Sequence, residues 1–255
     1  MLTPVAAGAR RRFGHLFSGH RELIAILAGG LDAGLGQLLV DDPQRPRVGR
    51  LSLGCYEVFG GDPEVPEAGA LVAGAARPRE LIYGGDPAWR RRLLEILGPA
   101  LSDRPMRSFD PSPLAVARLE ALSRLPDTRF QLARLDVPLA EQLDRELEPH
   151  ALQVYPSASA FAAAGVGFGA VAQGRLVCTA TSYTATPGHV EVAIATRPAF
   201  RGQGLALAVA ARLLRHCLEQ GSRPHWNASN PVSQRLAGRL GFGPGGVCEV
   251  LYLGA

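Results

Sequence analysis

The chain has 255 residues, of which 47% are hydrophobic and 20% are charged, and its formal net charge is +4. A chain of this length and composition buries a sizeable core and has room for two domains, which excludes wholesale disorder. All 27 basic residues are arginine, and this excludes a lysine-dependent phosphate loop, a Schiff-base lysine and a lysine nucleophile.

The first half predicts a small α/β arrangement, and nothing in it has the spacing of a catalytic site. An apolar run at residues 23–40 contains Asp32 and several glycines, so we predict neither a membrane span nor a signal peptide. Asp86 and Pro87 are typical of a helix N-cap and first helical position. The predicted elements are a helix at 10–29, strands at 36–40 and 50–58, a loop at 60–79, a strand at 81–83 and a helix at 86–97.

A connecting helix within residues 108–127, ending near Pro126, leads us to divide the chain into domains 1–127 and 128–255. The second half alternates strands and helices, which predicts an α/β (α+β) fold. Its predicted strands are 128–135, 167–172, 175–183, 189–196, 225–228 and 247–253, and its predicted helices are 140–147, 158–164, 205–220 and 231–240.

The cysteines Cys55, Cys178, Cys217 and Cys248 are widely separated and form no CxxC pair. This spacing argues against a disulfide framework and a zinc cluster, so we expect no metal. It is typical of a reducing compartment, and we predict a cytoplasmic protein. The arginine surplus carries little weight for nucleic acid, so we predict neither a nucleic-acid nor a membrane partner; RNA-dependent transfer stays a minor alternative.

The most informative segment is a glycine-rich turn between the predicted strand 189–196 and the predicted helix 205–220. Backbone N–H groups at a helix N-terminus are unpaired and carry partial positive charge, and glycine lets a phosphate approach them closely. Such a turn is suited to hold a diphosphate, and Arg201 adds a cation. A plain strand-to-helix connection with an exposed arginine explains the same four residues, RGQG, equally well.

The string RGQGLA at residues 201–206 fits the R-x-x-G-x-[GA] loop of GNAT-type N-acetyltransferases. Residues 155–243 further resemble the zwittermicin-resistance-type subgroup, with a Glu-containing strand that ends in Thr-x-Pro, a Trp226 strand, an Asn-x-x-Ser pair and a closing Leu-Gly-Phe. The resemblance is weaker in the first half, at LLVDDPQRP and EVFGGDP. The first half also has a strand–hairpin–helix order like that of GNAT proteins, which leads to the hypothesis that the first domain is a degenerate GNAT-like relative.

The resemblance implies the GNAT fold, with a mixed, mostly antiparallel central sheet flanked by helices and preceded by a smaller α/β domain. It implies acetyl-CoA as cosubstrate and a small-molecule primary amine as acceptor. The backbone at the end of strand 189–196 is then expected to pair with the pantetheine arm. The cofactor-binding residues implied are Ile194, Ala195, Thr196, Arg201, Gly202, Gln203, Gly204, Leu205, Ala206, Asn230 and Ser233.

Glu191 is the candidate general base, because the reaction needs a neutral amine. Along a strand, Glu191 shares one face with His189, Ala193 and Ala195, and the apolar Val190, Val192 and Ile194 share the other. The small alanines leave room for a ligand beside the carboxylate. An ordinary half-exposed strand with its polar residues outward is the competing interpretation.

The segment Asn230–Pro231 is typical of a helix N-cap, which explains Asn230 without a ligand. The resemblance adds the alternative that Asn230 and Ser233 line the cofactor. Many GNAT enzymes have a tyrosine acid where this chain has Ala237, so the acid has no candidate. That departure motivates a second hypothesis, a non-catalytic acyl-CoA-binding or regulatory module. The sequence does not indicate the oligomeric state.

Overall fold

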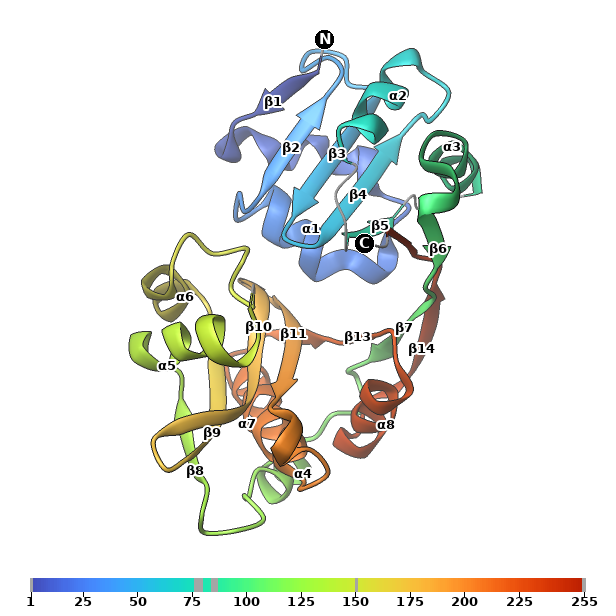
Figure 1. Cartoon of the computed structure of the whole chain (residues 1–255). Coiled ribbons are helices and arrows are strands. Elements are labelled where there is room, and N and C mark those ends of the chain that lie inside the picture. The colour runs from blue at the N-terminus through green and yellow to red at the C-terminus, as the bar shows by residue number, and fades with distance from the viewer. Residues whose placement is uncertain (1, 76–79, 84–86, 150, 254–255) are drawn as a thin grey trace. The chain divides into compact units, whose positions relative to one another are not determined.

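The computed structural model describes residues 2–75, 80–83, 87–149 and 151–253, and they form two compact units (Figure 1). The first unit holds the described residues up to Met106 and those from Val247, and the second runs from Arg107 to Gly246. This division differs from the one predicted at residue 127. Strand β7 (Met106–Asp110) is the reason, because it pairs with β13 (Asn227–Ala228) deep in the second half of the chain.

The described part of the first unit is built on one sheet with the strand order β1-β2-β3-β4-β5-β15-β6. The last strand of the chain thus lies between two strands from the first half, which explains why the C-terminal residues belong to this unit. The strands are β1 (Thr3–Val5), β2 (Gln37–Val40), β3 (Val48–Leu53), β4 (Tyr56–Gly61), β5 (Glu80–Tyr83), β6 (Leu101–Asp103) and β15 (Leu251–Leu253). The helices are η1 (Ala7–Phe17), η2 (Arg21–Leu23), α1 (Ile24–Leu31), α2 (Pro66–Ala73), α3 (Pro87–Leu97) and η3 (Gly98–Ala100).

The core of this unit packs α2 and α3 on the sheet. Phe59 of β4 and Trp89 of α3 are almost fully buried, with their ring centroids 5.3 Å apart. The Trp89 indole Nε1 donates to the carbonyl of Gly61 at 2.9 Å, so the buried ring has its polar atom satisfied. Leu71 and Leu93 complete the contact between the two helices and the sheet.

Three sequence predictions for the first unit need correction. The single strand at 50–58 is wrong: it is a hairpin of β3 and β4, because Gly54, at φ 60°, reverses the chain. The loop at 60–79 is also wrong, since α2 begins at Pro66 and buries Leu71, and its small residues hid the helical period. The helix at 10–29 is three shorter pieces, η1, η2 and α1. The predicted cap Asp86 lies outside the described residues.

The second unit contains a five-stranded sheet of order β12-β11-β10-β9-β8 and a small sheet of order β13-β7-β14. The large sheet is antiparallel except for the β11–β12 pair. This arrangement confirms the predicted mixed, mostly antiparallel sheet. The strands are β8 (Gln131–Arg134), β9 (Gly167–Ala172), β10 (Arg175–Thr186), β11 (His189–Thr196), β12 (Arg223–His225), β13 and β14 (Gly243–Cys248). The helices are α4 (Val116–Leu122), α5 (Val137–Gln142), η4 (Leu143–Leu147), α6 (Ala158–Ala164), η5 (Pro198–Phe200), α7 (Leu205–Glu219) and α8 (Pro231–Leu240).

Helices cover both faces of the large sheet, with α5 and α6 in front of it and α7 behind it in Figure 1. Helix α7 places Val209, Leu213 and Cys217 in the core, together with Val190 of β11. The hairpin between β9 and β10 turns at Gln173 and Gly174, whose φ angles of 50° and 75° are those of a tight two-residue hairpin turn. Strand β11 lies between its long partner β10 and the short β12, with α7 packed against it.

Several boundaries in the second unit differ from prediction, and β8 is shorter than the predicted strand 128–135. Trp226 divides the predicted strand 225–228 into β12 and β13. The predicted strand 247–253 is divided between β14 and β15, which lie in different sheets because the chain passes from the second unit to the first there. The predicted helix 140–147 begins three residues earlier, at Val137 after the Asp136 cap, and continues as the π-helical η4. The connecting segment 108–127 holds the end of β7 before α4, and β10 continues to Thr186. None of the helices in the described ranges has the length and apolar character needed to cross a membrane.

Candidate active site

Glu191 lies in the middle of the β10–β11–β12 layer and is only 2% exposed. Asn227 donates through Nδ2 to both carboxylate oxygens, at 3.1 Å to Oε1 and 3.3 Å to Oε2. Burial raises the pKa of Glu191 to about 7, while the hydrogen bonds from Asn227 act in the opposite direction. The carboxyl group is therefore poised to exchange a proton near neutral pH.

The two faces of β11 are divided as the sequence predicts. Val190, Val192 and Ile194 belong to the hydrophobic core beneath α7. Glu191 lies on the opposite face, because alternate residues of a strand point to opposite sides. The competing interpretation, a half-exposed strand with its carboxylate in water, is wrong because the Glu191 side chain is buried.

The two strands beside the site diverge directly after Glu191. Strand β12 pairs with β11 from His189↔Arg223 to Glu191↔His225, and the chain then enters β13, which pairs with β7 of the other sheet. Among the described strands, none pairs with the outer edge of β11 beyond that point. The backbone of residues 192–196 thus presents polar groups at an open edge, and this segment contains the predicted Ile194, Ala195 and Thr196.

The glycine turn follows that open edge and leads into α7. Gly202 and Gly204 have φ angles of 76° and 79°, which only glycine adopts readily, and Gly204 occupies the N-cap position of α7. No side chain of the described residues caps this end, and the first turn of α7 has no acidic residue. A Cβ added at Gly202 meets no atom within 4 Å, and one added at Gly204 meets only Pro126, at 4.0 Å, so little crowds the turn.

The flanking side chains tie the turn to the strand without filling its mouth. Arg201 is exposed and donates through Nε to the carbonyl of Thr196 at 3.3 Å. Gln203 donates to the carbonyl of Ala199 at 3.2 Å. Leu205 packs in the core, and Ala206 packs against it. The hydrogen bond between Arg201 and Thr196 therefore ties the turn to the end of β11.

Asn230 and Ser233 lie at the start of α8, and both have structural partners. Asn230 caps the helix, accepting from the backbone N–H of Ser233 at 2.9 Å, which confirms the predicted N-cap. The Ser233 hydroxyl accepts from the indole Nε1 of Trp226 at 3.0 Å. The alternative in which both residues line a cofactor stays a prediction. Ala237 is fully buried in the core, so its position offers no acid.

Two features of the site have no counterpart in the sequence prediction. Asn227 orients the carboxylate of Glu191, and no motif marked it as more than part of a strand. His189 and His225 lie in contact, with Nδ1 of one 3.0 Å from Nε2 of the other. Pairing of β11 with β12 was the missing information, because it places the two imidazoles on neighbouring strands. The described residues hold no cluster of three His, Cys, Asp or Glu side chains suited to a metal.

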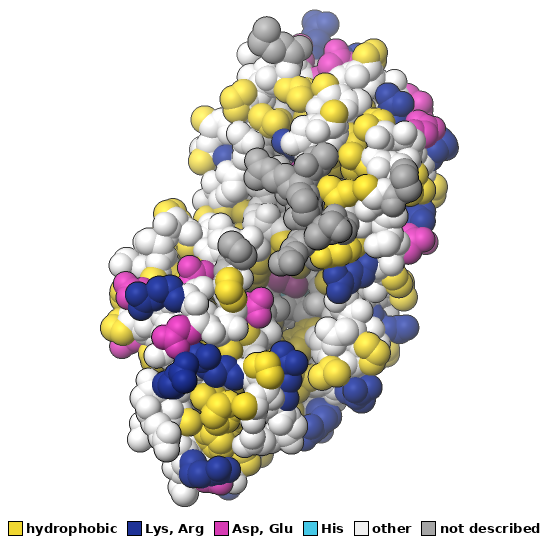
Figure 2. All heavy atoms as spheres, in the orientation of Figure 1, with side chains coloured by type: hydrophobic (Ala, Val, Ile, Leu, Met, Phe, Trp, Pro, Cys, Tyr) yellow, Lys and Arg dark blue, Asp and Glu magenta, His cyan; other side chains and the backbone are white. Residues whose placement is uncertain are grey.

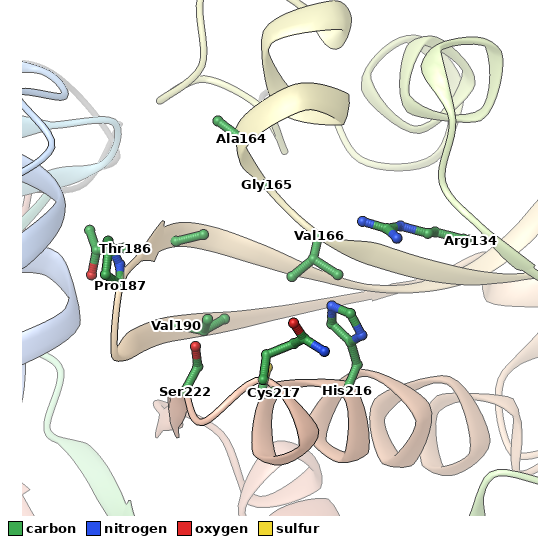
Figure 3. Close-up of a pocket in the computed structure, with 12 residues that line it drawn as sticks. Arg134, Ala164, Gly165, Val166, Thr186, Pro187, Val190, His216, Cys217 and Ser222 are labelled. Atoms are coloured by element: carbon green, nitrogen blue, oxygen red, sulfur yellow. The ribbon is translucent and has the colours of Figure 1, made fainter.

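A separate pocket of about 260 Å³ lies near the C-terminal end of α7. Figure 3 shows Arg134 and His216 at one part of its wall and Thr186 with Pro187 at another. None of the predicted site residues lines it. Helix α7 has 15 residues and is thus about 22 Å long, so the pocket and the glycine turn are at opposite ends of the helix.

The family model for GNAT acetyltransferases matches residues 15–246. The chain belongs to the GNAT acetyltransferase family. The match includes β11, the glycine turn and α8, and it also extends over most of the first unit. Members of this family use acetyl-CoA, which agrees with an open glycine turn at the end of a splayed strand.

Individual proteins resemble this chain in sequence or in fold. An uncharacterised N-acetyltransferase of Bacillus subtilis, YdfB, is 27% identical over 166 residues, an alignment that spans 64% of this chain and 62% of that protein. A GCN5-related N-acetyltransferase-like protein from Streptococcus suis has the same fold over 97% of this chain and 99% of its own, with a TM-score of 0.85 and 24% identity. A GCN5-related N-acetyltransferase from Kribbella flavida shares the fold at a TM-score of 0.61 and 19% identity, over 92% and 95% of the two chains.

Proposed function

We propose that this protein is an acetyl-CoA-dependent N-acetyltransferase that acetylates a primary amine of a small molecule, with Glu191 as general base. One observation carries the proposal. The open edge of β11 runs from the buried Glu191 carboxylate to Thr196, whose carbonyl accepts from Arg201 of the glycine turn. A base, an extended polar edge and an anion-binding helix end are thereby aligned along one strand.

The residues of the turn fit the diphosphate of acetyl-CoA. Unpaired amides at the start of α7 carry partial positive charge, and no carboxylate in the first helical turn competes with a phosphate. A Cβ at Gly202 would meet no atom within 4 Å and one at Gly204 only Pro126, at 4.0 Å, which supports an uncrowded turn. Arg201 is exposed beside them and supplies a full positive charge.

The cosubstrate supplies an activated acetyl group, and the protein must supply a neutral amine. A primary amine with a pKa near 10.4 is protonated at pH 7, and removing that proton costs about 4–5 kcal/mol. A positioned base recovers about 10²–10⁴-fold in rate. The pKa of Glu191, raised by burial to about 7, supports this role, and since its carboxylate is buried we propose that it takes the proton through an intervening water.

The amine nitrogen then bonds to the acetyl carbon as the carbon–sulfur bond breaks and the thiolate leaves, and the nitrogen loses its second proton through water to the thiolate. Backbone N–H groups at the open edge of β11 stabilise the negative charge that develops on the carbonyl oxygen, an effect worth a few kcal/mol in other enzymes. A thiol with a pKa of about 8.5 is a good leaving group, so proton delivery from water suffices where Ala237 stands. Catalysis without a tyrosine acid follows.

The resemblance to the zwittermicin-resistance-type subgroup leads us to propose an amino-bearing small molecule, such as an antibiotic, as the acceptor. None of the four cysteines forms a disulfide in the described residues, which supports the proposal of a reducing, cytoplasmic location. A non-catalytic acyl-CoA-binding module is the second candidate, because the tyrosine acid is absent at Ala237. That module would keep the glycine turn but would not need a buried carboxylate of raised pKa.

The deciding experiment compares wild type with Glu191→Gln in two assays. Titration calorimetry measures acetyl-CoA affinity, and thiol release measures turnover across a panel of aminosugars, polyamines and amino-acid amides. We expect equal acetyl-CoA affinity and a loss of about 10²–10⁴-fold in kcat for the variant. Binding without turnover of any amine in the wild type would favour the module, and no binding at all would overturn both.

A further inference from the structure

The two histidines beside Glu191 form a hydrogen-bonded pair. Nδ1 of His189 on β11 and Nε2 of His225 on β12 are 3.0 Å apart, and the rings are tilted by 47°. Two imidazoles at this distance share one proton between them, because one nitrogen must donate and the other accept. Each ring then has a second nitrogen facing away from the pair.

Strand register places this pair against the carboxylate. Glu191 and His225 are direct partners in the parallel β11–β12 ladder, and His189 precedes Glu191 by two residues. The three side chains therefore share one face of the sheet, with His225 beside Glu191 and His189 beyond it. The charged neighbour of the pair is Arg223, which forms an ion pair with Asp110 at 3.3 Å; Asn227 is the polar neighbour of Glu191.

Burial of the base creates a need that the pair can meet. Glu191 is 2% exposed, so a proton that it accepts has no direct contact with bulk water. His225 and His189 are both partly buried, so each ring retains some exposure. The pair thus occupies the strand positions next to the buried carboxylate and reaches solvent.

We propose that His225 and His189 form a proton relay that returns Glu191 to its carboxylate form after each turnover. This inference rests on the proposed function of Glu191. Water carries the proton from the carboxylic acid to the outer nitrogen of His225, the shared proton crosses to His189, and the outer nitrogen of His189 releases a proton to bulk solvent. One proton enters and one leaves, so both rings stay neutral overall and reset by exchanging tautomers.

The surroundings keep the pair in the state that such a relay needs. Burial lowers the pKa of His225 to about 4, and the neighbouring His189 and Arg223 act in the same direction. A ring that stays neutral at pH 7 has a free lone pair and passes protons on, whereas a permanently charged ring would hold them. The relay therefore operates at the pH at which Glu191 itself titrates.

The test uses His189→Ala and His189→Asn, with His15→Asn in the first unit as the matched surface control. The assay is thiol release from acetyl-CoA with the best amine of the panel, in dilute buffer. We expect kcat to fall at least about tenfold in both His189 variants, less than the loss for Glu191→Gln, with unchanged acetyl-CoA affinity. Added imidazole should restore kcat of His189→Ala in a concentration-dependent way and leave the control unaffected.

The relay would be overturned if both His189 variants kept wild-type kcat in dilute buffer. It would also be overturned if kcat fell in a variant that binds acetyl-CoA normally and imidazole did not restore it.

Nitrogen NMR of the histidine rings gives a second readout without any acceptor. We expect His225 to stay neutral from pH 5 to 8 and its ring signals to change on His189→Asn. A wild type without turnover would instead refute the proposed function, so the two failures are distinguishable.

Discussion

Asn227 on β13 donates to both carboxylate oxygens of Glu191 on β11, and the two residues belong to different sheets. The chain switches sheets at Trp226. This side chain is buried, and its ring centroid lies 5.6 Å from that of Phe242. The hydrogen bonds therefore bridge the fork where the strands diverge. They hold the carboxylate at the point where the open edge of β11 begins.

Replacing Asn227 with leucine should move the pH profile of the reaction upward. The side-chain hydrogen bonds of Asn227 lower the pKa of Glu191, so their loss raises that pKa further. A hydrogen bond to a charged group is worth about 1.5–3 kcal/mol, which corresponds to about 1–2 pH units. The pH dependence of kcat/KM measures the shift. If the acidic side of the kcat/KM profile does not move, Asn227 does not set the pKa of the Glu191 carboxylate.

The ionisation of Glu191 should also appear in the stability of the fold. Its pKa is about 7 in the folded chain and 4.5 in the unfolded chain, so the folded state binds more protons between these values. Stability from this group is fully present below pH 4.5 and is lost as pH rises through 7. Between pH 4.5 and pH 8 the unfolding free energy of wild type should fall by about 3 kcal/mol relative to that of Glu191→Gln.

Urea unfolding of both proteins between pH 4 and 8 measures this difference directly. As pH rises, the unfolding free energy of Glu191→Gln should increase relative to that of wild type. A gap that is independent of pH would mean that the carboxylate titrates in the fold as it does in water. A gap that changes in the opposite direction would mean that the fold stabilises the charged form.

Replacing Gly204 with leucine should weaken acetyl-CoA binding without a matching loss at a control glycine. Gly204 and Gly221 have similar φ angles of 79° and 69°, at the two ends of α7. A side chain costs about 1–2 kcal/mol of backbone strain at either position, so the two variants should be equally destabilised. Calorimetry should show at least about tenfold weaker binding, or about 1.4 kcal/mol, for Gly204→Leu alone. Equal affinities in the two variants would show that the diphosphate does not bind at this turn.

Variants of Asn230 separate its capping role from a role in ligand binding. Alanine removes the N-cap of α8 and should cost about 1 kcal/mol of unfolding free energy, whereas serine retains a capping oxygen and should cost little. If Asn230 only caps the helix, acetyl-CoA affinity should be unchanged in Asn230→Ser. Weaker binding by this stable variant would instead assign Asn230 to the cofactor surface.

Much of the second unit could be predicted because local signals there agree with the tertiary structure. The bounds of β9, β11 and α8 match the predicted ranges, since alternation, the Gln173–Gly174 turn and the Asn230 cap each mark an end. The hairpin at Gly54 was missed because the turn lies inside an apolar run without polar turn residues. Helix α2 was missed because its alanines and glycine give little contrast between its faces.

Burial of Glu191 lay beyond the sequence for a different reason. Alternation shows which face of β11 the carboxylate shares, but not what covers that face. The cover comes from Asn227, 36 residues further along the chain, after a change of sheet that no local pattern signals. The His189–His225 contact likewise depends on the register of two strands that are paired over only three residues each.

The central claim is that Glu191 removes the proton from the acceptor amine. The pH dependence of kcat for acetyl transfer, compared between wild type and Glu191→Gln, tests it most directly. We predict that wild type loses activity below a pKa of about 7, and that the variant is slower by about 10²–10⁴-fold and lacks this limb. An acid limb of the same pKa in Glu191→Gln, with turnover close to wild type, would contradict the account.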